Sequence, residues 1–267
     1  MLAYAAPIAF TLFVWWFATG VILYLDGLPQ RTFKFTMAGA TVLAGLGFVG
    51  LVASSRVATP AAAYCAFTCA LLVWAWQEVA FLLGWVTGPR RVPCPADARG
   101  WRRAALAFAT VAHHELALLL LGAGVAVATW GQANRTGLWT FAILWAMRQS
   151  AKLNVFLGVR NLSEEFLPAH LKYLQTYFVR KPMNALWPVS VIAASVAVVP
   201  LWAAASASPG GTYGFASAAL LATLLSLAIV EHLFLVLPLP FAALWQWGLR
   251  SHARTQAKQL AAAVPRR

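Results

Sequence analysis

Seven apolar runs, each long enough to cross a lipid bilayer as an α-helix, constrain this chain more than any other feature. The hydrocarbon core of a bilayer is about 30 Å thick, and about 20 helical residues span it. The runs lie near residues 3–25, 35–53, 61–86, 104–130, 137–158, 185–206 and 214–240. Short alternating strands are absent from the sequence pattern, so we predict an all-α integral membrane protein with seven transmembrane helices.

Composition supports the same class. Of the 267 residues, 61% are hydrophobic and 10% are charged, and the mean hydropathy is +0.72. These values are typical of a polytopic membrane protein. The first run has no charged segment before it and no cleavage site after it, so we expect a retained helix. No loop is long enough to form its own core, so we expect one polytopic domain over 1–267.

The basic residues predict the orientation of the chain. Eighteen of the 20 lysines and arginines lie in the segments 31–34, 90–103, 148–181 and 250–267. Only Arg56 and Arg135 fall in the loops of the opposite side. Because cytoplasmic loops are rich in Lys and Arg, we expect the N-terminus outside and the C-terminus inside. The net charge of +13 then serves orientation and lipid contact, and we expect no nucleic-acid partner, because no recognition motif accompanies these split segments.

The connection at 159–184 differs from the other loops, because apolar residues recur in it at helical spacing. Leu167, Leu171, Leu174 and Phe178 share one face, and Pro168 suits the start of a helix. We therefore expect an amphipathic helix near 167–179 on the cytoplasmic membrane surface.

The acidic residues beside this helix have two interpretations. In the first, Glu164 and Glu165 complement the N-terminus of the helix, and His170 is an interfacial side chain. In the second, the segment folds back under the bundle and supplies a carboxylate or a histidine to a site there.

Three glutamates inside apolar runs are the most unusual polar feature. Counted at about 1.5 Å per helical residue, Glu78, Glu115 and Glu231 lie roughly 12, 16 and 14 Å from the cytoplasmic ends of their runs. Arg148 lies at a similar depth on the fifth run, and Lys152 lies one turn nearer the surface. A charge in hydrocarbon is costly unless it is neutralised, paired or bound to a cation. We therefore expect these five groups to converge inside the bundle.

Two interpretations of this polar layer compete. One is a buried ion-pair network, in which Arg148 and Lys152 neutralise carboxylates and Gln77, Gln149 and Asn154 add hydrogen bonds. The other is a metal site, because helical bundles that hold two metal ions take carboxylates from several helices and a histidine from some of them. The candidate ligands are Glu78, His113, His114, Glu115, Glu231 and His232, joined by Glu164, Glu165 and His170 if their segment folds under the bundle.

The spacing of these candidates differs from that of soluble di-iron sites. His114 and Glu115 are adjacent, as are Glu231 and His232, so the members of each pair diverge by about 100° around the helix axis. Both members bind only if the metal lies between helices, or one of them supports the other. The expected ion is iron or another divalent transition metal. A tetrapyrrole held by a histidine, or a protonatable glutamate relay in a transporter, are further alternatives.

Three stretches of the sequence resemble a known family. They are Met147–Leu174 (MRQSAKLNVFLGVRNLSEEFLPAHLKYL), Arg180–Asn184 (RKPMN) and Glu231–Pro240 (EHLFLVLPLP). Together they resemble the photosynthetic-complex assembly family called PuhE, which belongs to purple phototrophic bacteria. The similarity extends from the third apolar run to the seventh.

The resemblance implies a multi-pass protein of the bacterial inner (cytoplasmic) membrane that acts in assembly of the photosynthetic reaction centre and its light-harvesting antenna, or in the supply of bacteriochlorophyll to them. The implied partners are the lipid bilayer, reaction-centre or light-harvesting subunits, and bacteriochlorophyll. It implies no catalytic residue. The alternative function is a metal-dependent membrane enzyme that acts on a pigment or a lipid-soluble substrate.

The charge asymmetry predicts a topology that reporter fusions can test. Fusions at positions 95 and 170 and at the C-terminus are expected to report the cytoplasm, and fusions at 57 and 210 the periplasm, because the basic loops stay inside. A C-terminal fusion that reports the periplasm contradicts the seven-span topology.

Overall fold

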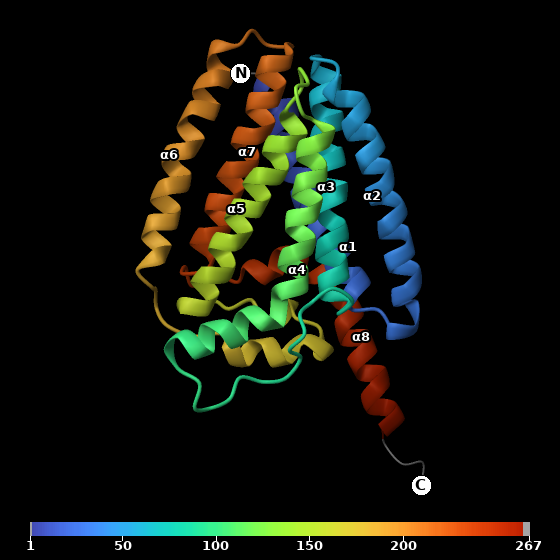
Figure 1. The fold of residues 1–267 in the computed structure, drawn as a ribbon, viewed down its shortest axis with the longest axis vertical. Coiled ribbons are helices and arrows are strands. Elements are labelled where there is room, and N and C mark those ends of the chain that lie inside the picture. The colour runs from blue at the N-terminus through green and yellow to red at the C-terminus, as the bar shows by residue number, and fades with distance from the viewer. Residues whose placement is uncertain (1, 264–267) are drawn as a thin grey trace.

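The computed structural model describes residues 2–263, which form a bundle of long helices without a β-strand in that range (Figure 1). This confirms the all-α prediction. Arg266 and Arg267, which enter the charge asymmetry, lie outside the described residues. The bundle helices are α1 (Leu2–Asp26), α2 (Phe33–Ser55), α3 (Pro60–Leu82), α4 (Gly100–Ala128), α5 (Thr136–Leu157), α6 (Leu186–Ala207) and α7 (Tyr213–Phe234).

Six of these helices are long and apolar enough to cross a membrane, as expected of a multi-pass membrane protein. The exception is α5, whose second half carries Arg148, Gln149, Lys152 and Asn154. It nevertheless runs along the bundle beside the apolar helices (Figure 1). The count of seven spans and the orientation stay predictions.

The centre of the bundle is built on α3 and α7, which are the most buried of the six apolar helices. Phe67 of α3 and Leu220 of α7 are fully buried in one core cluster. Small residues bring α5 close to this core. A Cβ added to Gly137 would lie 2.4 Å from the Leu51 side chain and 3.1 Å from the Ala66 carbonyl oxygen. The helices α2 and α6 lie at opposite edges (Figure 1).

Two helices end earlier than the apolar runs predict. α3 ends at Leu82, and Gly84 then adopts a positive φ of 77° that few other residues tolerate. α7 ends at Phe234 instead of continuing to residue 240. The prolines at 238 and 240 disfavour helix, and the Asn161 side-chain amide donates to the Phe234 and Leu237 carbonyl oxygens at 2.7 and 2.6 Å.

The helix α4 changes direction near the end of the bundle opposite the N-terminus. Its first part lies across that end, and the rest runs along the bundle (Figure 1). The loop after α3 is tied to it there. The Arg90 backbone N–H donates to the Ala109 oxygen at 3.1 Å, and the His114 N–H donates to the Thr87 oxygen at 2.8 Å. Fewer residues therefore separate Glu115 from that end of the bundle than its position in the run indicates.

The segment near 167–179 differs from the prediction in both type and packing. It forms a 3-10 helix, η3 (Ala169–Tyr177), instead of an α-helix. Its apolar face is real, but Leu171 and Leu174 are buried against Phe81 of α3. The segment therefore folds under the bundle, whereas the supply of a carboxylate or a histidine to a site there stays a prediction.

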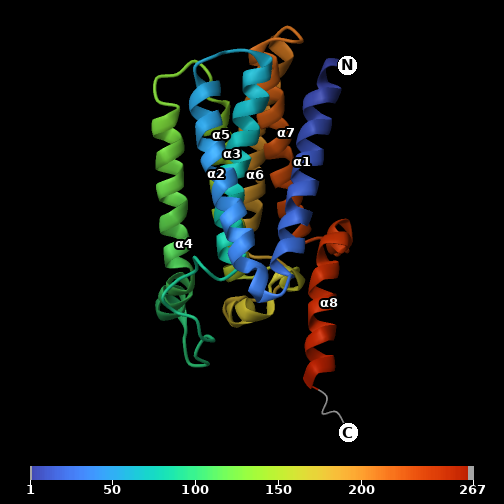
Figure 2. The same cartoon turned by 90° about the vertical axis from the view of Figure 1, so that its right-hand side faces the viewer.

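A further helix follows the bundle. The short 3-10 helix η4 (Phe241–Trp245) leads into α8 (Gln246–Ala263), which projects beyond the other helices (Figure 2). Its first turns pack on the end of α1. A Cβ on Gly248 would lie 2.4 Å from the Gly20 carbonyl oxygen, so the two backbones touch. Trp16 donates to the Leu244 oxygen at 2.8 Å, and Trp245 donates to the Trp16 oxygen at 2.9 Å.

His252 completes this junction. Its Nε2 lies 2.6 Å from Asp26 Oδ1, and Asp26 is only 4% exposed. Burial alone lowers the pKa of His252, but the hydrogen bond to Asp26, its negative charge and the Leu23 carbonyl outweigh burial and raise this pKa above 6.5. The protonated histidine is therefore favoured in the folded protein.

This shift predicts a pH-dependent attachment of α8. The contribution of His252 is fully present below its unfolded-state pKa and is lost as pH rises through the higher folded-state pKa. The free energy of unfolding of the wild type is expected to exceed that of His252→Gln by about 1–3 kcal/mol near neutral pH. The difference should shrink toward pH 9, as measured by unfolding in detergent micelles. The exposed His113→Gln is the control, and a pH-independent difference at position 252 contradicts the assignment.

Candidate ion-pair site

The polar face of α5 forms the centre of the candidate site. Arg148 and Lys152 are four residues apart and therefore share one face of the helix. Arg148 Nη2 donates to Glu78 Oε2 on α3 at 2.9 Å. Lys152 Nζ donates to Glu115 Oε1 on α4 at 2.7 Å. This is the arrangement that the ion-pair interpretation describes, and it links three helices through charge.

The two pairs differ in their exposure and in their hydrogen bonds. The Glu78 and Glu115 side chains are 12% and 16% exposed, whereas Arg148 is 41% exposed and Lys152 is 26% exposed. Glu115 is the better satisfied carboxylate, because its Oε2 also accepts a hydrogen bond from Gln149 at 2.6 Å. Removing Glu115 therefore leaves Lys152, the less exposed of the two bases, without its anionic partner.

Glu231 lies close enough to Arg148 and Glu78 for their charges to act on it, but it pairs with neither. Its residue is exposed, and its Oε1 accepts a hydrogen bond from the Trp15 indole on α1 at 2.7 Å. Sequence spacing cannot show this contact, because Trp15 and Glu231 are 216 residues apart. Glu78 and Glu115 thus have basic partners on α5, whereas Glu231 has a neutral indole as its hydrogen-bond partner, and the single layer of three carboxylates stays a prediction.

The histidines of the candidate site have three different environments. His232 is 2% exposed, and both of its ring nitrogens are engaged, with the Ala228 oxygen and the Ser150 hydroxyl each at 2.9 Å. His114 is fully buried against Phe81, with a ring-centroid distance of 4.6 Å, and neither ring nitrogen has a partner among the described residues. His113 is exposed.

The three amides expected to support the polar layer, Gln77, Gln149 and Asn154, differ in their hydrogen bonds. Gln149 contacts Glu115 as expected, whereas Asn154 donates to the Ser150 oxygen at 3.0 Å and to Ser190 at 3.2 Å. Gln77 is fully buried and has no hydrogen-bond partner within residues 3–255. Gln77 and His114 are thus the two wholly buried side chains near the ion pairs whose polar atoms stay unsatisfied.

The segment under the bundle brings its own polar groups only to the edge of the site. His170 Nε2 lies 2.8 Å from the Leu82 carbonyl oxygen at the end of α3, and burial lowers its pKa. Glu164 pairs with Arg180 at 3.1 Å, and Glu165 is exposed. No group of three or more His, Cys, Asp or Glu side chains within the described residues is arranged to hold a metal ion. The metal site stays a prediction.

Asn184 organises this end of the bundle, although no pattern in the sequence singles it out. Its amide nitrogen donates to the Asn154 and Gly158 backbone oxygens at 3.1 and 2.9 Å. Its side-chain oxygen accepts from the Leu186 and Trp187 backbone N–H groups at 2.8 and 3.2 Å. One side chain thus joins the end of α5 to the start of α6. A single Asn in a loop is a weak signal, because turn residues are common there.

Comparison with known proteins gives the family. The sequence model described as "Protein of unknown function (DUF3623)" matches residues 1–256. The chain is a DUF3623 protein. A relative from Rhodobacter capsulatus, described as "Uncharacterized 30.4 kDa protein in puhA 5'region", is 40% identical over 266 residues, covering 96% of this chain and 94% of the relative. No solved structure matches this DUF3623 chain.

The buried pair between α4 and α5 predicts a strong energetic coupling. Glu115→Gln is expected to destabilise the protein by about 3 kcal/mol, because Lys152 stays charged without its partner. Adding Lys152→Met should recover most of that loss. Unfolding in mixed micelles measures the free energy of unfolding of the single and the double variants.

The exposed ion pair of Arg180 and Glu164 supplies the control for this double-mutant cycle of Glu115 and Lys152. Glu164→Gln should cost less than about 1 kcal/mol, because solvent screens surface pairs. Additive effects of Glu115→Gln and Lys152→Met, without recovery in the double variant, contradict the coupling.

Proposed function

We propose that this protein is an inner-membrane factor that acts in assembly of the photosynthetic reaction centre and its light-harvesting antenna, or in the supply of bacteriochlorophyll to them. One observation carries the proposal. The 40% identical relative, matched over 96% of this chain, is described by its position in the 5' region of puhA, a photosynthesis gene. The match covers nearly the full length of both chains, which supports a shared role for the whole protein. The resemblance of residues 147–184 and 231–240 to the PuhE family points to the same process.

The contacts inside the bundle support a factor that holds or positions other molecules. Glu78 forms an ion pair with Arg148, and Glu115 forms one with Lys152. The carboxylate charges therefore hold the helices of the bundle together. Large apolar side chains instead face outward along the spans. Trp139 is 55% exposed and Val196 of α6 is 67% exposed, as suits contact with lipid or with another membrane helix.

A metal-dependent enzyme is the second candidate function. One observation favours it: His114 is fully buried beside the Glu115–Lys152 pair, and neither ring nitrogen is hydrogen-bonded within the described residues. A buried imidazole nitrogen without a hydrogen-bond partner is available to bind a metal ion. Binding of iron or another transition metal there requires Glu115 to leave Lys152. Elemental analysis of the purified protein separates this candidate from the first.

Deletion of the relative in Rhodobacter capsulatus tests the proposed function. The deletion strain is expected to lose a substantial fraction of the near-infrared absorbance of its reaction-centre and antenna complexes, and this chain should restore it. Bacteriochlorophyll extracted with solvent distinguishes the two roles. Total pigment falls if supply is impaired, whereas unassembled pigment rises relative to complexes if assembly is impaired.

Growth without light is the control for general membrane damage in this deletion. It should be unchanged, because respiration does not need photosynthetic complexes. Normal absorbance of the complexes in the deletion strain contradicts the proposed function.

A further inference from the structure

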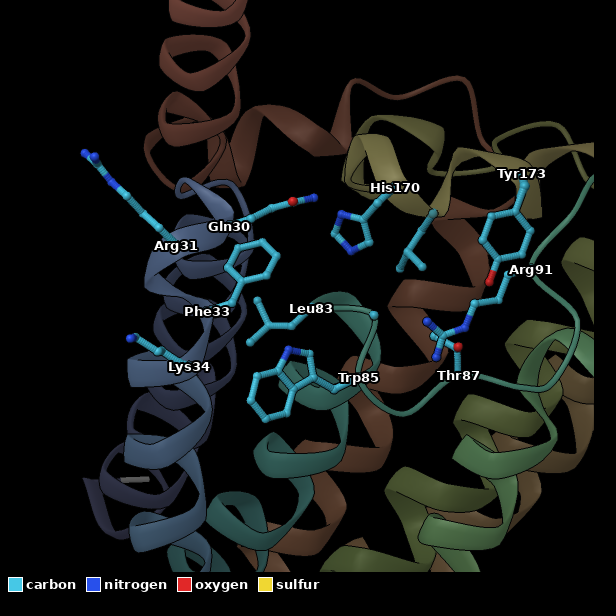
Figure 3. A pocket seen from close by; sticks show the side chains of 12 residues that line it. Gln30, Arg31, Phe33, Lys34, Leu83, Trp85, Thr87, Arg91, His170 and Tyr173 are labelled. Carbon is cyan, nitrogen blue, oxygen red and sulfur yellow. The ribbon is translucent and has the colours of Figure 1, made fainter.

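A cavity of about 590 Å³ opens at the end of the bundle where α2 begins and α3 ends, with η3 as its third wall (Figure 3). Three basic residues line it, and no acidic residue does. These residues are Arg31, Lys34 and Arg91. Of the acidic side chains near this end, Asp26, Asp97 and Glu164 pair with His252, Arg102 and Arg180, and Glu165 is exposed and does not line the cavity. The cavity therefore carries positive charge without a matching anion from its own wall.

Three hydrogen-bond donors meet at one side of this cavity. The Tyr173 hydroxyl points toward Thr87 and the Arg91 guanidinium (Figure 3). Thr87 is 1% exposed, and its hydroxyl and that of Tyr173 face each other with no other hydrogen-bond partner within the described part of the chain. A bond between two hydroxyls uses only one of their two O–H donors, so the second donor still needs an acceptor at this point. A guanidinium beside two hydroxyls is a donor set that suits a phosphate oxyanion.

The frame around these donors is fixed. The Thr87 carbonyl oxygen accepts the His114 backbone N–H at 2.8 Å, which holds the loop after α3 against α4. Gly84, at a φ of 77°, passes so close to His170 that a Cβ there would lie 3.0 Å from the imidazole ring. Burial raises the pKa of Tyr173, and the nearby Thr87 hydroxyl and Arg91 charge only partly offset this. The phenol is therefore neutral at physiological pH and able to donate.

The opposite side of the cavity is apolar. Phe33, Leu83 and Trp85 line it (Figure 3). Phe33 is in the first turn of α2, and Leu83 and Trp85 directly follow the end of α3; both helices are among the six apolar enough to cross a membrane. Trp85 is 53% exposed, and Phe35 beside this wall is 69% exposed. An apolar chain that leaves the cavity along these residues therefore continues into the bilayer.

We propose that this cavity binds an anionic amphiphile, with its phosphate group held by Arg91, Thr87 and Tyr173 and its apolar chain against Phe33 and Trp85. The shared chemistry is a phosphate oxyanion, whose source is either a membrane phospholipid or a soluble phosphate. The apolar wall and its position at the ends of two candidate spans favour the phospholipid.

Native mass spectrometry of the full-length protein in detergent micelles tests the proposal. Dioleoylphosphatidylglycerol is the probe, and dioleoylglycerol, which has the same chains without the phosphate, is the matched ligand. Wild type is expected to retain the phospholipid in preference to dioleoylglycerol. Arg91→Gln and Tyr173→Phe should each weaken retention about tenfold, because each removes one hydrogen bond to a charged group.

Arg31→Gln is the matched control variant. It removes the same charge from the same cavity rim, but its side chain points away from the donors (Figure 3). Retention should stay within about twofold of wild type, since the Arg31 guanidinium does not reach the bound phosphate and solvent screens its charge. Thermal unfolding of all three variants checks that each folds. Arg91 is exposed and Tyr173→Phe keeps the ring, so both should fold as wild type does.

Each outcome decides the proposal. Equal loss in Arg91→Gln and Arg31→Gln overturns it, because general surface charge then accounts for retention. Equal retention of dioleoylglycerol also overturns it, since the phosphate is then irrelevant. Displacement of the phospholipid by millimolar inorganic phosphate, together with loss of phosphate binding in Arg91→Gln, supports the oxyanion site and assigns its source to soluble phosphate.

Discussion

The ion pairs between α5 and its neighbours are the constraint on which the rest of the bundle depends. A lone carboxylate or ammonium in an apolar bundle is unfavourable, so Glu115 and Lys152 must be placed together. This requirement fixes the rotation of α5 about its axis and its height relative to α4. Once α5 is fixed in this way, Gly137 meets the Ala66 carbonyl on α3, and the tightly packed core around Phe67 follows.

The helices could be predicted from the sequence because the hydrophobicity that marks them is a local property. Apolar runs of about 20 residues need only length and composition to be recognised, and the observed helices follow them closely. The errors lie at the ends, where a glycine or a proline ends a helix before hydrophobicity does. α8 was missed because its residues are polar and basic, and its docking depends on Gly20, more than 200 residues earlier in the sequence.

The candidate site was predictable only in part, for a related reason. The depth of a charged residue in an apolar run can be counted from the sequence, which brought Glu78, Glu115, Arg148 and Lys152 together correctly as neighbours. The hydrogen-bond partner of each side chain cannot be counted in the same way. Glu231 shows the consequence, since its carboxylate accepts a hydrogen bond from Trp15 of α1, 216 residues away in the sequence.

The contact between α1 and α8 makes the end of α1 depend on residues more than 200 positions later in the sequence. Asp26 is 4% exposed, and the side chain that meets it is His252. Without residue 252 this carboxylate lacks its hydrogen-bond partner at the end of α1. Trp16 and Trp245 hold the same two segments together, because each indole donates to a backbone oxygen of the other segment. The end of α1 and residues 244–252 therefore stabilise each other, and a change in either segment weakens both.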